Sequence, residues 1–485
     1  MNGPLRRLAA VVAVLFAALM IGDTWVQFVS ADSLNARPGN ARSLYKEYGR
    51  ERGPLLVAGD AVAESIKVED PYGYLRTYPG GAMYSHLTGF FSVVYGSTGM
   101  ESASGDVLSG TADQQFYRRI GDLLTGERPQ GASIELTINP KLQQTAWDAL
   151  GDQRGALVAL DPRTGDVLAL VSKPGYDPDL LAGHDAAKVR AARTKLLADR
   201  TRPLENRAIA SQLYPPGSVF KLVTAAAALS SGRFTPQSQL DGPAALKLPQ
   251  SSASLPNDFS GACGPGGKIS LADALRISCN TAFGSLGIAL GDEALRAQSE
   301  KFGFGQDLRI PLKVTPSTFP SSVDDAQTAL SAIGQYDDRV TPLQVAMVSA
   351  AIANQGVLMR PNLIRTVRNG SNFEVIDRPQ PERFGEPITA QVAADLTGMM
   401  TGVVESGTGR RAQIDGVKVA GKTGTAQNGE GRPPLAWFTA FAPADNPQIA
   451  IAVVVEDGGS LGDAASGGRV AAPIAREVIA AAVRQ

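Results

Sequence analysis

A serine and a lysine stand three positions apart in the segment Tyr214-Pro-Pro-Gly-Ser-Val-Phe-Lys221. A Pro-Gly turn interrupts the chain, and Ser218 begins a helix predicted for the apolar run that follows. Lys221 therefore lies on the same helix face as Ser218. A lysine amine beside a serine hydroxyl can activate that hydroxyl as a nucleophile. The structural alternative is that Ser218 only caps the helix.

Two further short motifs follow in the chain: Ser278-Cys279-Asn280 and Lys422-Thr423-Gly424. Spacing alone is weak evidence, because Ser43 and Lys46 repeat the first spacing, and Ser33 and Asn35 repeat that of Ser278 and Asn280. Context is more informative. The first motif opens a helix, the second lies in a helical region, and the third lies on a strand followed by two more strands. We expect three separate elements to bring these motifs to one cleft.

Together the motifs supply what acyl transfer requires: a nucleophile, a neutral base, a proton donor for the leaving amine and donors for the oxyanion. Ser218 would attack the carbonyl. Lys221 would take the proton, because burial and nearby positive charge lower the pKa of its amine. Ser278 would pass a proton to the leaving amine, and Asn280 would position Lys221 and the substrate amide.

The third motif would bind substrate. Lys422 adds positive potential, Thr423 can hold a carboxylate, and Gly424 lets the strand approach the substrate closely. The predicted oxyanion donors are the backbone N–H groups of Ser218 and Thr425.

The elements expected to carry these motifs follow from periodicity and turn chemistry. Asn139 and Pro140 predict the start of a helix ending near Leu150, and Thr341-Pro342 predicts another ending near Asn354. The remaining predictions are strands over residues 133–138, 155–160, 166–171, 417–425, 436–442 and 449–456, helix over 272–290, and a final helix over 470–483 that packs on the sheet.

Composition excludes several classes of function. The 485 residues include 46 Lys plus Arg and 47 Asp plus Glu, so no strong field favours nucleic acid. Two widely spaced histidines and two cysteines form no zinc pattern, and we predict neither a metal site nor a cofactor. The length allows two or three domains.

The N-terminus predicts export. Arg6 and Arg7 precede an uncharged run over residues 8–22, which continues through Trp25 as one membrane-spanning helix with a cytoplasmic N-terminus. The alternative is a signal peptide cleaved near Val29-Ser30-Ala31. We favour the anchor. The predicted organisation is a stub and anchor over residues 1–31, a small mixed α/β module over 32–130 and a catalytic domain over 131–485.

The two cysteines, Cys263 and Cys279, flank a glycine-rich loop. Outside the cytoplasm they can be oxidised, and closing a loop of about 15 residues would stabilise the fold by roughly 3 kcal/mol. A pair of buried thiols is the alternative.

A different nucleophile motif, Gly-x-Ser-x-Gly, occurs at Gly458-Gly-Ser-Leu-Gly462. It would imply a hydrolase whose catalytic histidine comes last in the chain, but His86 and His184 both precede it. We predict a flexible loop between the last strand and the final helix.

With these motifs the chain resembles the monofunctional class B penicillin-binding proteins, and most closely their penicillin-binding protein A type. The resemblance covers nearly the whole chain. Besides the three motifs and the anchor it rests on Arg52-Gly-Pro-Leu-Leu-Val57, Tyr78-Pro-Gly80, Ser85-His-Leu-Thr-Gly89, Leu136-Thr-Ile138, Ala159-Leu-Asp-Pro-Arg-Thr-Gly165, Asn206-Arg-Ala208, Gly334-Gln335, Thr341-Pro-Leu-Gln344 and Lys422-Thr-Gly-Thr425.

The resemblance implies a penicillin-binding transpeptidase fold of the serine β-lactamase type, α+β or α/β in class. An antiparallel sheet flanked by helices and a helical subdomain would follow an N-terminal mixed module and one transmembrane helix. Tyr336 follows Gln335 where the family usually has glycine, and Cys279 is the middle residue of the second motif. The first departure would alter only the local shape of the cleft, and the second would allow a redox-sensitive loop at the site.

The resemblance also implies a D,D-transpeptidase of cell-wall synthesis, acting in division or in cell shape. It would cross-link D-Ala-D-Ala stem peptides through an acyl-enzyme at Ser218, and β-lactams would inhibit it covalently. Residues 32–130 would be a non-catalytic pedestal that contacts a polytopic membrane glycosyltransferase. The enzyme would be a single-pass protein of the cell membrane with its catalytic domain outside the cytoplasm.

Two alternatives use the same motifs. A β-lactamase or carboxypeptidase would deacylate with water, but no Glu-x-x-Leu-Asn follows Ser278 to supply the base of class A β-lactamases. A penicillin sensor would require a cytoplasmic output domain, and we expect none before Leu8. A scaffold role is compatible with an active site.

Overall fold

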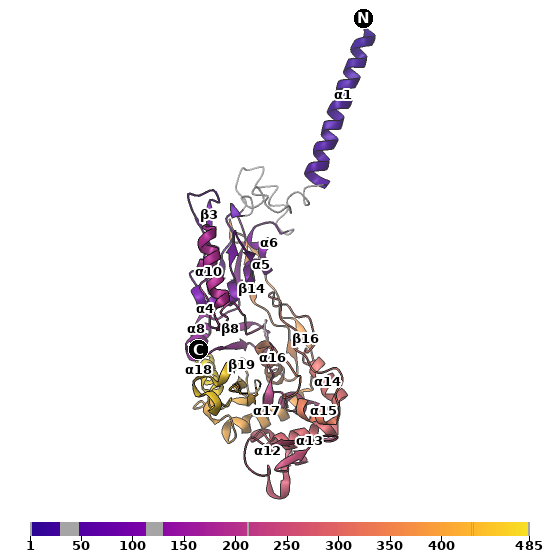
Figure 1. Cartoon of the computed structure of the whole chain (residues 1–485), viewed down its shortest axis with the longest axis vertical. Coiled ribbons are helices and arrows are strands. Elements are labelled where there is room, and N and C mark those ends of the chain that lie inside the picture. Colours follow the sequence, from indigo (N-terminus) through magenta and orange to yellow (C-terminus); the bar gives the residue numbers. More distant parts are fainter. Residues whose placement is uncertain are drawn as a thin grey trace.

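The computed structural model describes residues 2–29, 48–112, 130–210, 213–427, 429 and 431–483, and two β-sheets organise most of them (Figure 1). Several residues named above lie outside the described ranges: Ser30, Ala31, Ser33, Asn35, Ser43 and Lys46.

The N-terminal segment forms helix α1 (Asn2–Thr24), which continues into a wider turn, η1 (Trp25–Val29). Residues Gly3–Gln27 are long and apolar enough to cross a membrane, and none of their side chains is buried by the rest of the chain. Large apolar side chains such as Phe16 and Leu19 are therefore exposed, as lipid contact requires.

The first sheet has the strand order β15-β14-β6-β1-β2-β3, in which β1 and β6 are parallel and all other pairs are antiparallel. Its strands are β1 (Leu55–Val57), β2 (Asp60–Lys67), β3 (Tyr74–Thr77), β6 (Ser133–Leu136), β14 (Ile364–Arg368) and β15 (Val375–Asp377). Small elements beside it are α4 (Gly81–Thr88), β4 (Phe91–Ser92), β5 (Gly96–Ser97), α5 (Gly99–Ala103) and α6 (Gly105–Leu108). The sheet thus joins strands from both sides of the boundary predicted at residue 130.

The second sheet is antiparallel, with the order β17-β18-β19-β7-β8. Its strands are β7 (Gly155–Leu160), β8 (Val167–Lys173), β17 (Ala420–Ala426), β18 (Leu435–Ala442) and β19 (Ile449–Val455). Every residue of β19 is buried, because helices cover both faces of the sheet. Ile449 and Ile451 pack with α8 (Pro140–Leu150) and α18 (Ala471–Val483), whereas Ala450 and Ala452 face α11 (Lys221–Ser230), α16 (Pro342–Ala353) and α17 (Ala390–Glu405).

A helical subdomain lies at the other side of the molecule from α18 (Figure 1). It contains α12 (Leu271–Arg276), α13 (Asn280–Leu290), α14 (Asp292–Lys301) and α15 (Asp325–Ser331). The remaining elements are α9 (Asp179–Ala182), α10 (Ala186–Ala198), η3 (Gly217–Val219), β9 (Gln239–Asp241), β10 (Ala245–Lys247), β11 (Ser254–Pro256), η4 (Pro265–Gly267), β12 (Lys268–Ser270), β13 (Leu358–Met359), β16 (Arg383–Gly385), η5 (Arg410–Ala412) and η6 (Glu456–Ala464).

Most element predictions are confirmed. Asn139 caps α8 by accepting a hydrogen bond from the Leu142 N–H, and Thr341 caps α16 in the same way. α18 packs on the second sheet as expected. The continuous helix predicted over residues 272–290 is wrong, since the chain leaves the helix between α12 and α13, at Ser278, whose φ of 60° is left-handed.

The Gly-x-Ser-x-Gly segment lies between the last strand and the final helix, as predicted, but it forms an irregular 3-10 segment where a loop was expected. It belongs to η6, which connects β19 to α18 and contains several left-handed residues. Ser460 is exposed. His86 contacts the carbonyl of Pro174, and His184 pairs with Asp70, so both histidines have partners far from this serine in sequence.

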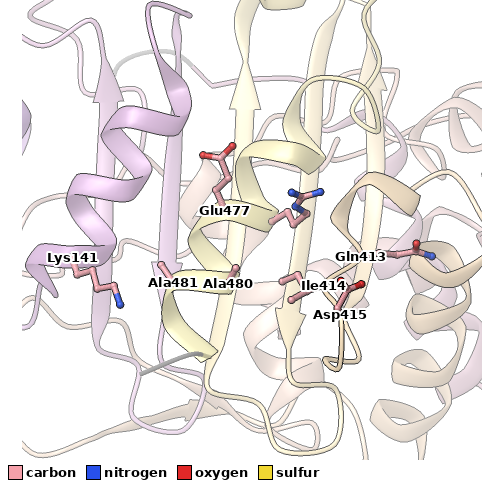
Figure 2. Close-up of a pocket in the computed structure, with 8 residues that line it drawn as sticks. Lys141, Gln413, Ile414, Asp415, Glu477, Ala480 and Ala481 are labelled. Carbon is pink, nitrogen blue, oxygen red and sulfur yellow. The ribbon is translucent and has the colours of Figure 1, made fainter.

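A surface pocket of about 490 Å³ lies between α8, α18 and the loop before β17 (Figure 2). It is lined by Lys141, Gln413, Ile414, Asp415, Arg476, Glu477, Ala480 and Ala481. None of these is a predicted site residue. The pocket lies on the sheet face covered by α8 and α18, whereas Ser218 precedes α11 on the other face. We therefore assign this pocket no part in the chemistry.

Candidate active site

The turn that presents Ser218 is held by contacts from distant segments. The hydroxyl of Tyr214 donates to Glu456 Oε1 at 2.6 Å, and the Trp437 indole donates to the Pro215 carbonyl at 3.1 Å. Gly217 has φ +54°, and a Cβ there would lie 2.7 Å from the Thr425 carbonyl oxygen. Only glycine combines this backbone conformation with this close approach. The turn is therefore fixed against β17.

Glu456 forms several of the contacts that hold this turn. Its Oε1 also accepts a hydrogen bond from Arg207 Nε at 2.8 Å, and the Arg207 side chain is fully buried. A buried cation that loses its partner is strongly destabilising, because its desolvation is no longer offset. Glu456 thus connects the end of β19 to the segment before Ser218.

Replacing Glu456 by alanine should lower the free energy of unfolding by about 3–5 kcal/mol. Chemical denaturation of the protein without helix α1 would measure the loss. Glu382→Ala is the matched control, because Glu382 pairs with Arg360 at 3.0 Å on the surface and should change stability by less than about 1 kcal/mol. Equal, small losses in both variants would contradict this role of Glu456.

Ser218 lies in η3, one turn before Lys221, the first residue of α11. Its side chain does not cap α11, so the structural alternative for Ser218 is wrong. Ser218 is 6% exposed. No residue in the described ranges forms a hydrogen bond with its hydroxyl, and catalytic hydrogen bonds commonly tighten only when substrate binds.

Two buried lysines meet at the hydroxyl of Ser278. Lys221 Nζ lies 3.2 Å and Lys422 Nζ 2.9 Å from Ser278 Oγ. Lys221 Nζ also donates to the Ser278 carbonyl at 2.8 Å and to Asn280 Oδ1 at 2.7 Å. Lys422 Nζ donates to the Thr423 carbonyl at 2.7 Å. The structure therefore brings residues from all three motifs together.

Burial lowers the pKa of both amines. Burial and the Lys422 cation hold the pKa of Lys221 well below its usual range. Burial lowers the pKa of Lys422 to about 7, and Asp258 opposes that fall. Lys221 therefore loses its proton well below the usual pH range of a lysine, which suits a general base that must be neutral when it acts.

The hydrogen bonds of Lys221 fit a neutral amine. A neutral amine has two N–H donors, which the Ser278 carbonyl and Asn280 Oδ1 use at the shorter distances. Its lone pair is then free to accept a proton. Ser278 Oγ accepts from Lys422 Nζ at 2.9 Å and lies 3.2 Å from Lys221 Nζ, so one hydroxyl connects the two amines.

Ser278 reaches this position through the break between α12 and α13. Its left-handed φ is uncommon for a residue with a side chain and marks local strain at a functional site. Cys279 is buried, caps α13 and is bonded to Cys263, with their Cα atoms 6.0 Å apart. The cysteines are thus a disulfide, which holds the loop before the second motif.

The third motif lies on β17, the edge strand of the second sheet, and passes close to η3. A Cβ on Gly424 would lie 3.0 Å from Val219 Cγ1, so a side chain there would push the strand away from Ser218. Thr423 Oγ1 is 2.6 Å from Thr408 Oγ1, and the Thr425 carbonyl accepts from Gln335 Nε2 at 3.2 Å.

Sequence reasoning missed two residues at this site, Asn257 and Asp258. Asn257 Oδ1 accepts from the N–H groups of Asn280 and Thr281, and Asp258 Oδ1 accepts from Asn280 Nδ2. They belong to an irregular loop about 20 positions before Asn280, and no periodicity or motif marks them.

Family comparison agrees with this geometry. Residues 155–480 match the penicillin binding protein transpeptidase domain, and residues 52–134 match the penicillin binding protein A dimerisation domain.

Full-length relatives are also similar. The chain is 45% identical to the peptidoglycan D,D-transpeptidase PbpA of Mycolicibacterium smegmatis, over 100% of both chains. It is 42% identical to PbpA of Mycobacterium tuberculosis, over 100% of this chain and 99% of that one.

Solved structures show the same likeness. The ceftriaxone acyl-enzyme of penicillin-binding protein A from M. tuberculosis aligns with a TM-score of 0.87 at 42% identity, covering 90% of this chain and 100% of that chain. The penicillin G acyl-enzyme of the same protein aligns with a TM-score of 0.84 over the same shares of the two chains.

Proposed function

Because the chain belongs to the penicillin-binding protein transpeptidase family, we propose that it is a peptidoglycan D,D-transpeptidase that forms an acyl-enzyme at Ser218. One observation carries the residue assignment. The hydroxyl of Ser278 is shared by the amines of Lys221 and Lys422, and Ser218 lies one turn before Lys221. This is the constellation that acyl transfer through a serine needs.

In the first half-reaction, Ser218 Oγ attacks the carbonyl carbon between the two terminal D-alanines, and its proton passes to Lys221. The N–H groups of Ser218 and Thr425 donate to the oxyanion. When the tetrahedral intermediate collapses, the C–N bond breaks and the leaving D-Ala amine takes a proton through Ser278. Lys422 keeps this region positive, and Thr423 binds the terminal carboxylate.

In the second half-reaction, the amine of a neighbouring stem peptide attacks the acyl-enzyme, loses its proton to Lys221 and releases Ser218. A β-lactam undergoes only the first half-reaction. Its strained amide opens on Ser218, and the product remains attached. The β-lactam acyl-enzymes of the M. tuberculosis relative support this part of the proposal.

A reconstituted cross-linking reaction tests the function. The full-length protein, lipid-linked precursor and a glycosyltransferase without transpeptidase activity should give cross-linked muropeptides and free D-alanine, and penicillin should suppress both. Release of D-alanine without cross-links would instead indicate a carboxypeptidase. Neither product, with penicillin also unable to label the protein, would contradict the proposal.

We also propose that residues 1–31 are an uncleaved anchor, that 32–130 are a pedestal and that 131–485 are the catalytic domain of a single-pass membrane protein. The apolar helix α1 supports the anchor, and the match of residues 52–134 to a separate domain supports the pedestal. Protease added outside intact spheroplasts should digest the catalytic domain and leave a membrane-bound N-terminal fragment. Protection of that domain would contradict this topology.

The pedestal is proposed to bind a polytopic membrane glycosyltransferase, since the family match includes no glycan-polymerising domain. The exposed apolar side chain of Ile66, on β2 of the pedestal, offers a position for photo-cross-linking. Cross-links to membrane proteins other than a glycosyltransferase would argue against this partner.

A further inference from the structure

A loop over residues 256–263 wraps around the start of α13 and determines how the second motif is held. Asn257 in this loop is buried, and both the oxygen and the nitrogen of its side-chain amide form hydrogen bonds that hold the loop in place. The Asn257 oxygen accepts from the N–H groups of Asn280 and Thr281, at 3.0 and 3.1 Å, and its nitrogen donates to the carbonyls of Pro243 and Gly261. The disulfide at Cys263 closes the loop.

The next residue, Asp258, contacts the side chain of Asn280. Asn280 Nδ2 donates to Asp258 Oδ1 at 3.1 Å and to the Pro256 carbonyl at 3.2 Å. The Asn280 amide oxygen, on its other side, accepts from Lys221 Nζ at 2.7 Å. The amide therefore has acceptors at its nitrogen and a donor at its oxygen.

We propose that Asp258 is a positioning residue for the transpeptidase reaction, whose carboxylate orients the amide of Asn280 toward Lys221. The inference rests on the proposed function, because it assigns Asp258 a part in the step that Lys221 performs. Asp258 acts through Asn280 and through its charge, without contact with the reacting atoms.

The orientation argument follows from the two ends of the amide. If the Asn280 amide turned over, its NH2 group would face the N–H groups of Lys221, and its oxygen would face the carboxylate of Asp258 and the Pro256 carbonyl. Both ends would then oppose like groups. Asp258 thus destabilises the inverted orientation of the Asn280 amide. Because the carboxylate is negatively charged, it repels the amide oxygen more strongly than a neutral carbonyl would.

The charge argument concerns the lysines. The charged groups that act on Lys221 are Lys422 from β17 and Asp258 from the loop, and Asp258 also acts on Lys422. Asp258 is the one charged residue between positions 248 and 267. By attraction it raises the pKa of both amines against the effect of burial. Although Asp258 is solvent-exposed, a substrate that covers the cleft would exclude water and strengthen this attraction.

Two variants separate the two effects. Asp258→Asn removes the charge but keeps an oxygen that can accept from Asn280 Nδ2. Asp258→Ala removes the charge and the acceptor. Asp415→Asn, in the pocket on the opposite sheet face, is the control. The measurement is the second-order rate of acylation by a fluorescent penicillin between pH 5 and 9, with thermal unfolding of each variant.

In Asp258→Asn, the acid limb of the rate profile should move to lower pH, because both lysines lose their proton more easily without the carboxylate. Its rate on the plateau should change by less than about threefold. Asp258→Ala should show the same shift and a further loss of about tenfold on the plateau, because the Asn280 amide is no longer held in one orientation. Asp415→Asn should match the wild type.

Profiles of both Asp258 variants that coincide with the wild type would overturn the inference. Equal rate losses at all pH values with a lower unfolding temperature would also overturn it, because they would indicate a purely structural role. Failure of the proposed function is distinguishable, since the wild-type protein itself would then not be acylated.

Discussion

Replacing Ser218 with alanine is expected to abolish covalent labelling by penicillin and to reduce cross-linking by a factor of about 10⁴–10⁶. In the proposed mechanism the acyl-enzyme forms through the Ser218 oxygen, and Ser278 cannot replace it, because its hydroxyl is bound to both lysines. The effect should be the largest of any single substitution, because the covalent intermediate is lost.

Intact-protein mass spectrometry after incubation with penicillin measures the labelling. Ser460→Ala is the matched control, since Ser460 belongs to the competing Gly-x-Ser-x-Gly segment and is exposed in η6. This control should be labelled at one mole per mole, like the wild type. Labelling of Ser218→Ala at the same stoichiometry would show that the nucleophile is elsewhere.

Lys221→Met should lower the rate of acylation by about 10²–10⁴, the usual contribution of a general base. Methionine fills a similar volume in the fully buried site but cannot accept a proton. The protein should remain folded, because a buried ionisable group is replaced by an apolar one. Stopped-flow acylation by a chromogenic cephalosporin measures the rate.

The pH dependence of the acylation rate tests whether Lys221 is the titrating base. In the wild type, Lys221 acts as the neutral amine, so the rate should fall with decreasing pH as the amine becomes protonated. Burial and the Lys422 cation hold the pKa of Lys221 well below its usual range, which moves this loss to lower pH than for an ordinary lysine. This fall in rate at low pH should be absent from the residual activity of Lys221→Met. A limb retained at the same pH would assign it to another group. Lys195→Met, on the exposed face of α10, should leave both rate and profile unchanged.

Local chemistry made several parts of the fold predictable. The caps at Asn139 and Thr341 begin helices through hydrogen bonds within three residues of each cap, and such contacts depend little on the rest of the fold. The apolar strands of the second sheet were recognisable because both of its faces are covered, so nearly every position must be apolar. The apolar stretch of α1 depends only on length and composition.

Other parts were unpredictable because they depend on contacts that are distant in sequence. The first sheet pairs β6 with β14, more than 200 positions later, and strand pairing at such separations leaves no signal in either segment. The apolar periodicity of residues 272–290 continues across the gap between α12 and α13. Tertiary contacts interrupt it, because Ser278 is held between two lysines and Cys279 is bonded to Cys263.

The chemical groups of the proposed active site were recognisable from the amino-acid sequence: a serine and a lysine one turn apart, a second serine with an asparagine, and a lysine on a strand. They were recognisable because each motif is a local arrangement whose residue types carry their own reactivity. How these groups share protons depends on contacts between distant segments of the fold. The burial of Lys221, the position of Ser278 Oγ between two amines and the contact of Asp258 with Asn280 arise where separate segments pack together. Charge state and hydrogen-bond direction depend on that packing, since both are set by desolvation and by neighbouring charges.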